Sequence, residues 1–154
     1  MTDSAVTAVD AGNRKVARQV VVGAPAAEVF ALLADPHRHG ELDGSGTVKD
    51  TVSGPPRLSP GAKFSVGMKQ YGVPYKITST VTAYEDGRLL EWQHPMGHRW
   101  RWALAETEPG RTQVTETFDY TTSKAPKVLE LMKIPSTNAT GITKTLEGLA
   151  ARFH

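Results

Sequence analysis

The sequence predicts an α+β domain in which a strand and two short helices precede an antiparallel meander, and a helical region ends the chain. Two observations carry this prediction. The spacing of apolar residues changes from a period near 3.6 to a period of 2 after the first helices. The strands of the second part are joined by links of two or three residues, whereas parallel strands need crossovers of a dozen or more.

The first elements are expected between residues 15 and 39. Residues 15–23 (KVARQVVVG) are rich in valine and end at a glycine, which predicts a strand. A helix follows, with Pro25 at its first position and one apolar face spaced i, i+3, i+4, i+7. That face consists of Ala26, Val29, Phe30 and Leu33. Asp35-Pro36 ends this helix, and PHRHG forms a second short helical turn.

The meander contains the remaining expected strands. Their ranges are 47–52, 62–71, 74–85, 88–94, 98–107 and 111–121. The turns between the last five are Gly72-Val73, Asp86-Gly87, Pro95-Met96-Gly97 and Glu108-Pro109-Gly110, of which Asp-Gly is a strong hairpin signal. A helical region over 126–153 then ends the chain, and Pro135 is expected to break or kink it.

Composition limits the class of protein. The chain has 154 residues, which fits a single domain over 15–154 behind a disordered tail at 1–14. A net charge of +2 without a basic stripe argues against a nucleic-acid partner, and no apolar run is long enough for a membrane span. The absence of cysteine excludes thiol chemistry and fits a cytoplasmic protein. The oligomeric state is expected to be a monomer or homodimer.

The turns also predict which side chains share a face of the sheet. Met68 is expected opposite Ile77, Val81 opposite Trp92, Trp92 opposite Trp100, His94 opposite His98, Trp100 opposite Phe118, and Trp102 opposite Glu116. One face then collects apolar and aromatic residues, while Glu91, Arg99 and Arg101 face water. The apolar face is Phe64, Val66, Met68, Tyr75, Ile77, Val81, Leu90, Trp92, Trp100, Trp102, Leu104, Val114, Phe118 and Tyr120.

A polar minority shares that inner face. It consists of Gln70, Ser79, His94, His98 and Glu116. The histidines lie beside a turn and are explained by ordinary hydrogen bonding. Glu116 lies in mid-strand opposite Trp102, where a carboxylate needs a partner or becomes protonated. Glu116 is therefore the candidate acid or base, with His94 as a candidate partner, although two strands separate their ladders.

The order of these elements resembles the START/Bet v1-like (SRPBCC) superfamily, and within it the bacterial polyketide cyclase/dehydrase-like proteins. The resemblance lies in VVVGAPAAEVFALLADPHRHGEL (20–42) and LSPGAKF (58–64), and it covers nearly all of the chain after residue 15. It implies a helix-grip fold, in which a curved antiparallel sheet of about seven strands wraps around a long C-terminal helix. The chain departs from the family pattern at two points. The segment HRHGELDG lacks the tryptophan that many members carry there, and the meander has no inward arginine.

The resemblance implies a cavity between the sheet and the C-terminal helix that binds a hydrophobic or aromatic small molecule, polyketide-like or lipid-like. No cofactor is expected. The implied ligand-binding residues are Phe64, Val66, Met68, Tyr75, Ile77, Ser79, Val81, Leu90, Trp92, His94, Trp100, Trp102, Glu116, Phe118, Tyr120, Val128 and Met132. Val128 and Met132 would belong to a helical lid over that cavity.

Three other functions remain open at this point. One is a cyclase, aromatase or dehydratase in which Glu116 acts as acid or base with His94 beside it and Tyr75 or Tyr120 as hydrogen-bond donor. Another is a protein-interaction module whose cavity is filled by side chains. A metal site built from His94, His98, His37 and His39 is the third, but no carboxylate stands at a recognised ligand spacing, so no metal is expected.

Overall fold

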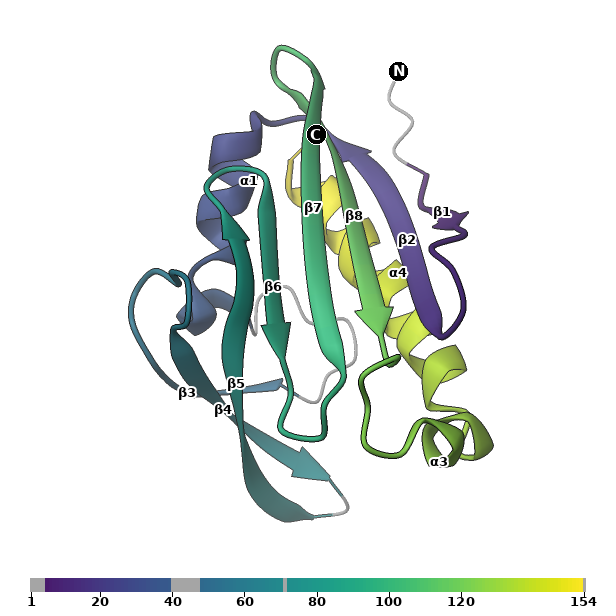
Figure 1. The fold of residues 1–154 in the computed structure, drawn as a ribbon. Coiled ribbons are helices and arrows are strands. Elements are labelled where there is room, and N and C mark those ends of the chain that lie inside the picture. The colour runs from purple at the N-terminus through teal and green to yellow at the C-terminus, as the bar shows by residue number, and fades with distance from the viewer. Residues whose placement is uncertain (1–4, 40–47, 71, 154) are drawn as a thin grey trace.

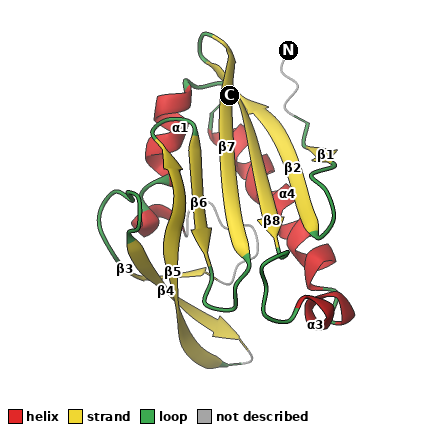
Figure 2. Cartoon of the chain, in the orientation of Figure 1, coloured by secondary structure: helices red, strands yellow, loops and turns green. Residues whose placement is uncertain are grey.

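The computed structural model describes residues 5–39, 48–70 and 72–153, with the backbone alone at 48–51 and 68–70. One antiparallel sheet runs in the order β1-β2-β8-β7-β6-β5-β4-β3, so the first long strand pairs with the last (Figure 1). Its strands are β1 (Thr7–Val9), β2 (Lys15–Val22), β3 (Val48–Ser53), β4 (Lys63–Gln70), β5 (Val73–Glu85), β6 (Leu89–Gln93), β7 (Arg99–Glu108) and β8 (Arg111–Asp119). The main helices α1 and α4 lie on the same face of the sheet (Figure 2). This is the helix-grip fold, with eight strands in the described chain.

The helices begin and end close to the expected residues. Helix α1 (Ala26–Leu33) follows Pro25, which is its N-cap residue and not its first helical residue, and it buries Val29, Phe30, Leu32 and Leu33. The short helix η1 (Pro36–Arg38) is capped by the Asp35 carboxylate, which accepts a hydrogen bond from the His37 amide. Asp35-Pro36 therefore both ends one helix and begins the next.

Two helices form the C-terminal region, because the helical conformation is interrupted at residues 132 and 133, just before Pro135. Helix α3 (Pro126–Leu131) is followed by Lys133 in the left-handed conformation (φ 59°), and α4 (Ile134–Arg152) starts directly after it. Pro135 therefore lies in the first turn of α4, where its missing amide hydrogen costs no hydrogen bond. At the far end of α4, the Phe153 carbonyl accepts a hydrogen bond from the Gly23 amide.

Most of the predicted registers are confirmed. Val81 pairs with Trp92, Trp92 with Trp100, Trp100 with Phe118, and Trp102 with Glu116. The His94 amide donates to the His98 carbonyl, as the expected turn requires.

The register of the β4–β5 hairpin was predicted wrongly by two residues. Met68 pairs with Tyr75 rather than Ile77, because Gln70 pairs with Val73 and the turn falls one residue earlier than Gly72-Val73. A shift of two keeps every side chain on its predicted face. The faces are therefore right although the partners are wrong.

A bulge in β5 changes which residues face the helices beyond Val81. Continuing the predicted register from Val81 and Trp92 would place Ala83 opposite Leu90. The pairing of β5 with β6 shifts between Val81 and Ala83, so that Tyr84 rather than Ala83 shares a face with Leu90. The Tyr84 ring meets Phe30 of α1 edge-on, with ring centroids 5.5 Å apart. The extra residue thus places an aromatic side chain under α1.

The N-terminal segment differs from the expected disordered tail. Thr7–Val9 forms β1, whose register pairs Thr7 with Gln19 and Val9 with Ala17. Ala17 is buried there. The short alternation in this segment is enough to add a strand once the free edge of β2 is available, and that edge is not visible in the sequence.

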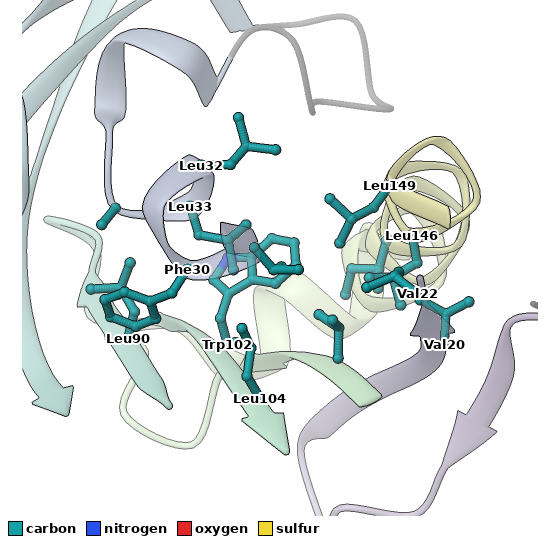
Figure 3. Close-up of a cluster of buried hydrophobic side chains, with 14 of the residues drawn as sticks. Val20, Val22, Phe30, Leu32, Leu33, Leu90, Trp102, Leu104, Leu146 and Leu149 are labelled. Carbon is teal, nitrogen blue, oxygen red and sulfur yellow. The ribbon is translucent and has the colours of Figure 1, made fainter. Parts of the chain in front are cut away.

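The core lies between α1, α4 and the adjoining strands. Figure 3 shows Phe30, Leu33, Trp102, Leu104, Leu146 and Leu149 converging from α1, α4 and β7. Val20 and Val22 of β2 and Val114 of β8 complete this cluster, and all of them are almost fully buried. We call this region of the inner face the packed end.

Candidate functional site

The inner face of the sheet has a second region, which we call the aromatic end. It is the half of the face near the β6–β7 turn, and its rings come from β4, β6, β7 and β8, from that turn, and from the residues after η1 and β8. Its members are His39, Phe64, Trp92, His94, His98, Trp100, Phe118 and Tyr120. Trp92, His94, His98 and Trp100 are only half-buried, although their side chains point to the face that the helices cover.

One group of rings surrounds Trp92. His39 stacks on Trp92 with ring centroids 5.0 Å apart and an interplanar angle of 23°. Phe64 meets both rings edge-on, at 5.4 Å from Trp92 and 5.5 Å from His39. The His39 Nε2 lies 2.8 Å from the Leu33 carbonyl oxygen, which joins this group to the end of α1. His39 thus supplies an aromatic ring in the segment HRHGELDG, where many family members carry a tryptophan.

A second group surrounds Phe118. The His94 and His98 rings stack at 4.2 Å, and His98 meets Phe118 edge-on at 5.2 Å. Trp100 lies 5.0 Å from Phe118, and Tyr120 stacks on its other side at 5.5 Å. Because Trp92 and Trp100 are register partners, the two groups form one continuous aromatic surface across four strands.

The three histidines of this surface are neutral near pH 7. Burial lowers the pKa of His39 and of His94 below the usual 6.5. Burial, followed by the nearby His94, lowers the pKa of His98 to about 4. The His94 Nδ1 accepts a hydrogen bond from the Met96 amide at 3.0 Å, so its proton resides on Nε2. These rings therefore act as polar aromatic groups and not as cations.

The turn that carries His94 and His98 is fixed in place. Gly97 has a φ of 101°, and a Cβ added there would overlap the Thr122 carbonyl oxygen. The Thr122 hydroxyl donates to the Gly97 carbonyl at 2.5 Å, and the Lys124 amide donates to the Met96 carbonyl at 2.9 Å. The turn is thus bound to the segment that leads into α3.

Glu116 lies between the two ends, in a row of register partners. Leu90, Trp102, Glu116 and Arg18 follow one another across β6, β7, β8 and β2. Glu116 is 7% exposed, as expected for an inward side chain. Arg18 of β2 lies directly opposite Glu116 on the same face, so the inner face does contain an arginine, from outside the meander.

The register keeps Glu116 and His94 apart. His94 is level with His98, which is four residues along β7 from Trp102, the partner of Glu116. Four residues span about 13 Å along a strand, and two strand spacings add about 9.6 Å across the sheet. The backbones are thus about 16 Å apart, which is too far for a direct hydrogen bond. Both remain candidate catalytic residues, but they do not form a pair.

The remaining predicted ligand-binding residues fall into three groups. Phe64, Val66, Ser79, Val81, Leu90, Trp102, Phe118 and Tyr120 are buried, and Ile77 is half-buried. Tyr75 is 39% exposed, on the part of β5 that extends past the end of β6. The side chain of Met68 lies outside the described residues, as does that of Gln70 from the polar minority of the inner face.

Val128 and Met132 do not cover the sheet as the expected lid. They are 51% and 64% exposed, and Leu131 beside them is 82% exposed. The reason is the orientation of α3, which packs Leu129 toward the core and leaves Glu130 exposed beside Tyr120 and Arg14. The Glu130 carboxylate accepts a hydrogen bond from the Tyr120 hydroxyl at 2.9 Å and pairs with Arg14 at 3.3 Å.

Helix α4 also differs between its halves. Its buried residues are Ile142, Thr145, Leu146, Leu149 and Ala150, all from residue 142 onward. Residues 134–141 include none that is buried, and they carry small and polar side chains such as Ser136, Thr137 and Thr140. This first half begins at the aromatic end of the sheet (Figure 1). The half-buried rings and this incompletely buried part of α4, in which Ile134 packs against the core, therefore belong to the same end of the molecule.

The outer face of the sheet carries two hollows and a buried carboxylate. The hollows have volumes of about 300 and 380 Å³, and Arg101 borders both. Glu91 was expected to face water, but it is 6% exposed. It accepts hydrogen bonds from the Thr82 hydroxyl at 2.9 Å and from Arg101 at 3.1 Å, with Arg99 3.8 Å away. These groups are charged and ion-paired, so they do not match a hydrophobic ligand.

The described residues contain neither a cluster of metal ligands nor a helix that could cross a membrane. Among the described residues, no group of three or more histidine, aspartate or glutamate side chains is placed to hold a metal ion. His94 and His98 stack on each other instead. In the same part of the chain, no helix has the length and apolar character that crossing a membrane requires.

Comparison with known proteins identifies the family. Residues 13–154 match the family described as polyketide cyclase/dehydrase and lipid transport. The chain belongs to this family. A Mycobacterium tuberculosis protein, Rv0088, is 51% identical over 152 residues, which cover 96% of this chain and 68% of that protein.

Solved structures show the same fold at low sequence identity. A Rhodobacter sphaeroides protein superimposes with a TM-score of 0.72 at 16% identity, covering 96% of each chain. The polyketide-cyclase-like protein Cgl2372 of Corynebacterium glutamicum does so with a TM-score of 0.61 at 19% identity, covering 91% of each chain. At this identity the likeness concerns the fold alone.

Sequence reasoning missed two residues of the inner face. His39 was considered only as a metal ligand, because nothing local shows that the end of η1 reaches Trp92. Arg18 was overlooked, although its alternation with Val16, Val20 and Val22 in β2 marks it as inward. The signal was present for Arg18, but its position opposite Glu116 depends on the pairing of the first and last long strands.

Proposed function

We propose that the protein binds a hydrophobic, largely aromatic small molecule between the aromatic end of the sheet and the first half of α4. One observation carries the proposal. Trp92 and Trp100 pair across β6 and β7 on the inner face, yet both remain half-buried while the residues of the packed end are fully covered. Large rings left partly uncovered on a concave face are typical of a ligand site.

The chemistry of the wall indicates the kind of ligand. Flat ring systems stack on tryptophan and neutral histidine in offset or edge-to-face arrangements. The His94 Nε2 carries a proton, and the buried His98 Nδ1 has no hydrogen-bond partner within the described part of the chain. The His94 Nε2–H would donate to one carbonyl or hydroxyl oxygen of an otherwise apolar ligand.

Titration calorimetry with anthraquinones, flavonoids and fatty acids tests this proposal. We expect one class to bind and the Trp100→Ala variant to weaken binding about tenfold, since a lost aromatic contact is worth about 1 kcal/mol or more beyond its area. Gln113→Ala is the matched control, because Gln113 lies on the outer face of β8. The proposal fails if no class binds, or if both variants bind as the natural protein does.

The enzyme hypothesis is left with less support. A general acid and a general base must both reach the reacting part of one substrate, and Glu116 and His94 are about 16 Å apart by their backbones. Glu116 faces Arg18 instead, across β2 and β8. We therefore propose binding as the function, with Glu116 and Arg18 as a polar boundary between the ligand and the packed end.

A further inference from the structure

The exposed apolar side chains gather at one end of the molecule. Among the described residues, the large hydrophobic side chains with high exposure come from three segments: the β4–β5 hairpin, the β6–β7 turn and α3 with the residue after it. They are Val73, Tyr75, Met96, Val128, Leu131 and Met132, and we call them the apolar rim. The three segments lie at the same end in Figure 1.

Hydrogen bonds and an ion pair hold two of these segments, the β6–β7 turn and α3, in position. The Met96 carbonyl accepts a hydrogen bond from the Lys124 amide, which ties the β6–β7 turn to the entry of α3. Glu130 is held by Tyr120 and Arg14, so α3 cannot turn its Leu131 face inward without breaking both contacts. The part of the rim formed by Met96, Val128, Leu131 and Met132 is thus held in place by contacts around it.

The charges around the rim are mostly basic. Lys76 lies beside Tyr75, Lys127 lies in α3, and Lys124 and Lys133 lie on either side of that helix. All four are exposed. The acid between them in the sequence is Glu130, which is paired with Arg14. The segments 72–80 and 95–98 contain no acidic residue.

Apolar side chains ringed by lysines match one kind of surface. Helices that lie on membranes place leucine, methionine and aromatic residues at the acyl boundary and lysines at the headgroups. Each basic residue near an anionic bilayer contributes about 1 kcal/mol, which is about a fivefold change in affinity. A protein partner would need an acidic surface with an apolar centre, and no feature of this chain calls for one.

We propose that the apolar rim and its lysines dock on the surface of an anionic lipid bilayer. In this position Val128, Leu131 and Met132 of the α3 segment enter the headgroup region together with Met96 and Val73. The aromatic end of the sheet then faces the bilayer. Docking needs no ligand, so this proposal is independent of the small-molecule site.

Vesicle sedimentation with the full chain tests the proposal. We use vesicles of phosphatidylcholine alone and vesicles with equal parts of phosphatidylglycerol. The protein is expected to bind the anionic vesicles, to bind the neutral ones far more weakly, and to be released by high salt, which screens exposed charges. Binding to neither, or to both equally, would overturn the proposal.

Paired variants locate the surface. Leu131→Ser with Met132→Ser, and separately Lys127→Gln with Lys133→Gln, are each expected to weaken binding about tenfold or more. The matched controls are Ala27→Ser with Ala31→Ser on the exposed side of α1, and Lys63→Gln with Lys144→Gln, which removes the same charge. Thermal melting confirms that each variant is folded.

If the rim variants and the control variants weaken vesicle binding equally, the apolar rim is not the docking surface. Sedimentation equilibrium without lipid tests the alternative that a second copy of the chain covers the apolar rim. A rim-dependent dimer that disappears in Leu131→Ser with Met132→Ser would show that a second copy covers this surface, and it would overturn the membrane proposal. Ligand titrations are run on the same variants, so that loss of vesicle binding and loss of the small-molecule site are distinguished.

Discussion

The packed end and the aromatic end of the sheet have the same alternation of inward and outward residues but different coverings. At the packed end, α1 and the second half of α4 close over Val20, Trp102, Leu104 and Val114, which are almost fully buried. At the aromatic end, the first half of α4 buries no residue and the tryptophans are half-exposed. The comparison teaches that alternation decides which face a side chain occupies, while the opposing element decides whether it becomes core or site.

The largest effect is expected from Phe30→Ala at the packed end. Phe30 is fully buried, contacts Tyr84 edge-on and lies beneath the Arg57 guanidinium at 5.5 Å. Removing a buried phenylalanine ring costs about 3–5 kcal/mol of unfolding free energy. Urea denaturation measures it, with Trp100→Ala as the comparison. If Trp100→Ala costs as much as Phe30→Ala, the aromatic end is ordinary core and the contrast between the ends is wrong.

Gly97→Ala tests how firmly the aromatic end is held. A Cβ at this position meets the Thr122 carbonyl oxygen, and the φ of 101° is unfavourable for alanine. We expect a loss of about 2–3 kcal/mol of unfolding free energy. Gly87→Ala, with a φ of 76° and open space around its Cβ, is the control that carries backbone strain without overlap. Equal losses in both variants would mean that the turn is not braced by the segment before α3.

The alternation of the meander made the faces of the sheet predictable, because the side-chain period is 2 and short turns leave few registers. Trp92, Trp100, Trp102 and Glu116 were placed correctly for this reason. The β4–β5 partners were not, because residues 71–73 allow two turns whose registers differ by two. Tyr84 was missed because a bulge adds a residue without any sequence period to mark it.

The site was less predictable than the fold. The position of His39 on Trp92 depends on where η1 ends in space, and the exposure of Val128 and Met132 depends on the Glu130 contacts with Tyr120 and Arg14. These are long-range contacts between polar or aromatic groups, and a helical pattern of apolar residues does not encode them. The apolar face of α3 was visible in the sequence, but the side to which it turns was not.

Acid is expected to weaken the aromatic end more than the packed end. The pKa of His98 is lowered to about 4 in the folded protein, whereas the unfolded chain takes up this proton near 6.5. As the pH falls from 6.5 to 4, the unfolded state binds more protons, so stability is full above 6.5 and declines across this window. For a half-buried ring the loss is about 1–2 kcal/mol after solvent screening.

Melting temperatures across this pH range measure the effect. His98→Phe keeps an aromatic ring on Phe118 and removes the titration, so its melting temperature is expected to fall less between pH 7 and pH 4. His37→Gln is the control, because His37 is exposed. An unchanged slope in His98→Phe would show that carboxylates, rather than the buried histidines, govern the acid response.

The smallest effect on stability is expected from Leu131→Ser. Leu131 is 82% exposed on α3, and substitutions at exposed positions away from contacts usually stay within about 0.5 kcal/mol. Leu129 on the same helix packs against the core, so Leu129→Ser should cost several times more. Urea denaturation at two protein concentrations shows whether α3 is exposed in a monomer or covered by a second copy. A large, concentration-dependent loss in Leu131→Ser would mean that a second copy covers α3 in solution, and the aromatic end would then be closed by an interface rather than open to a ligand.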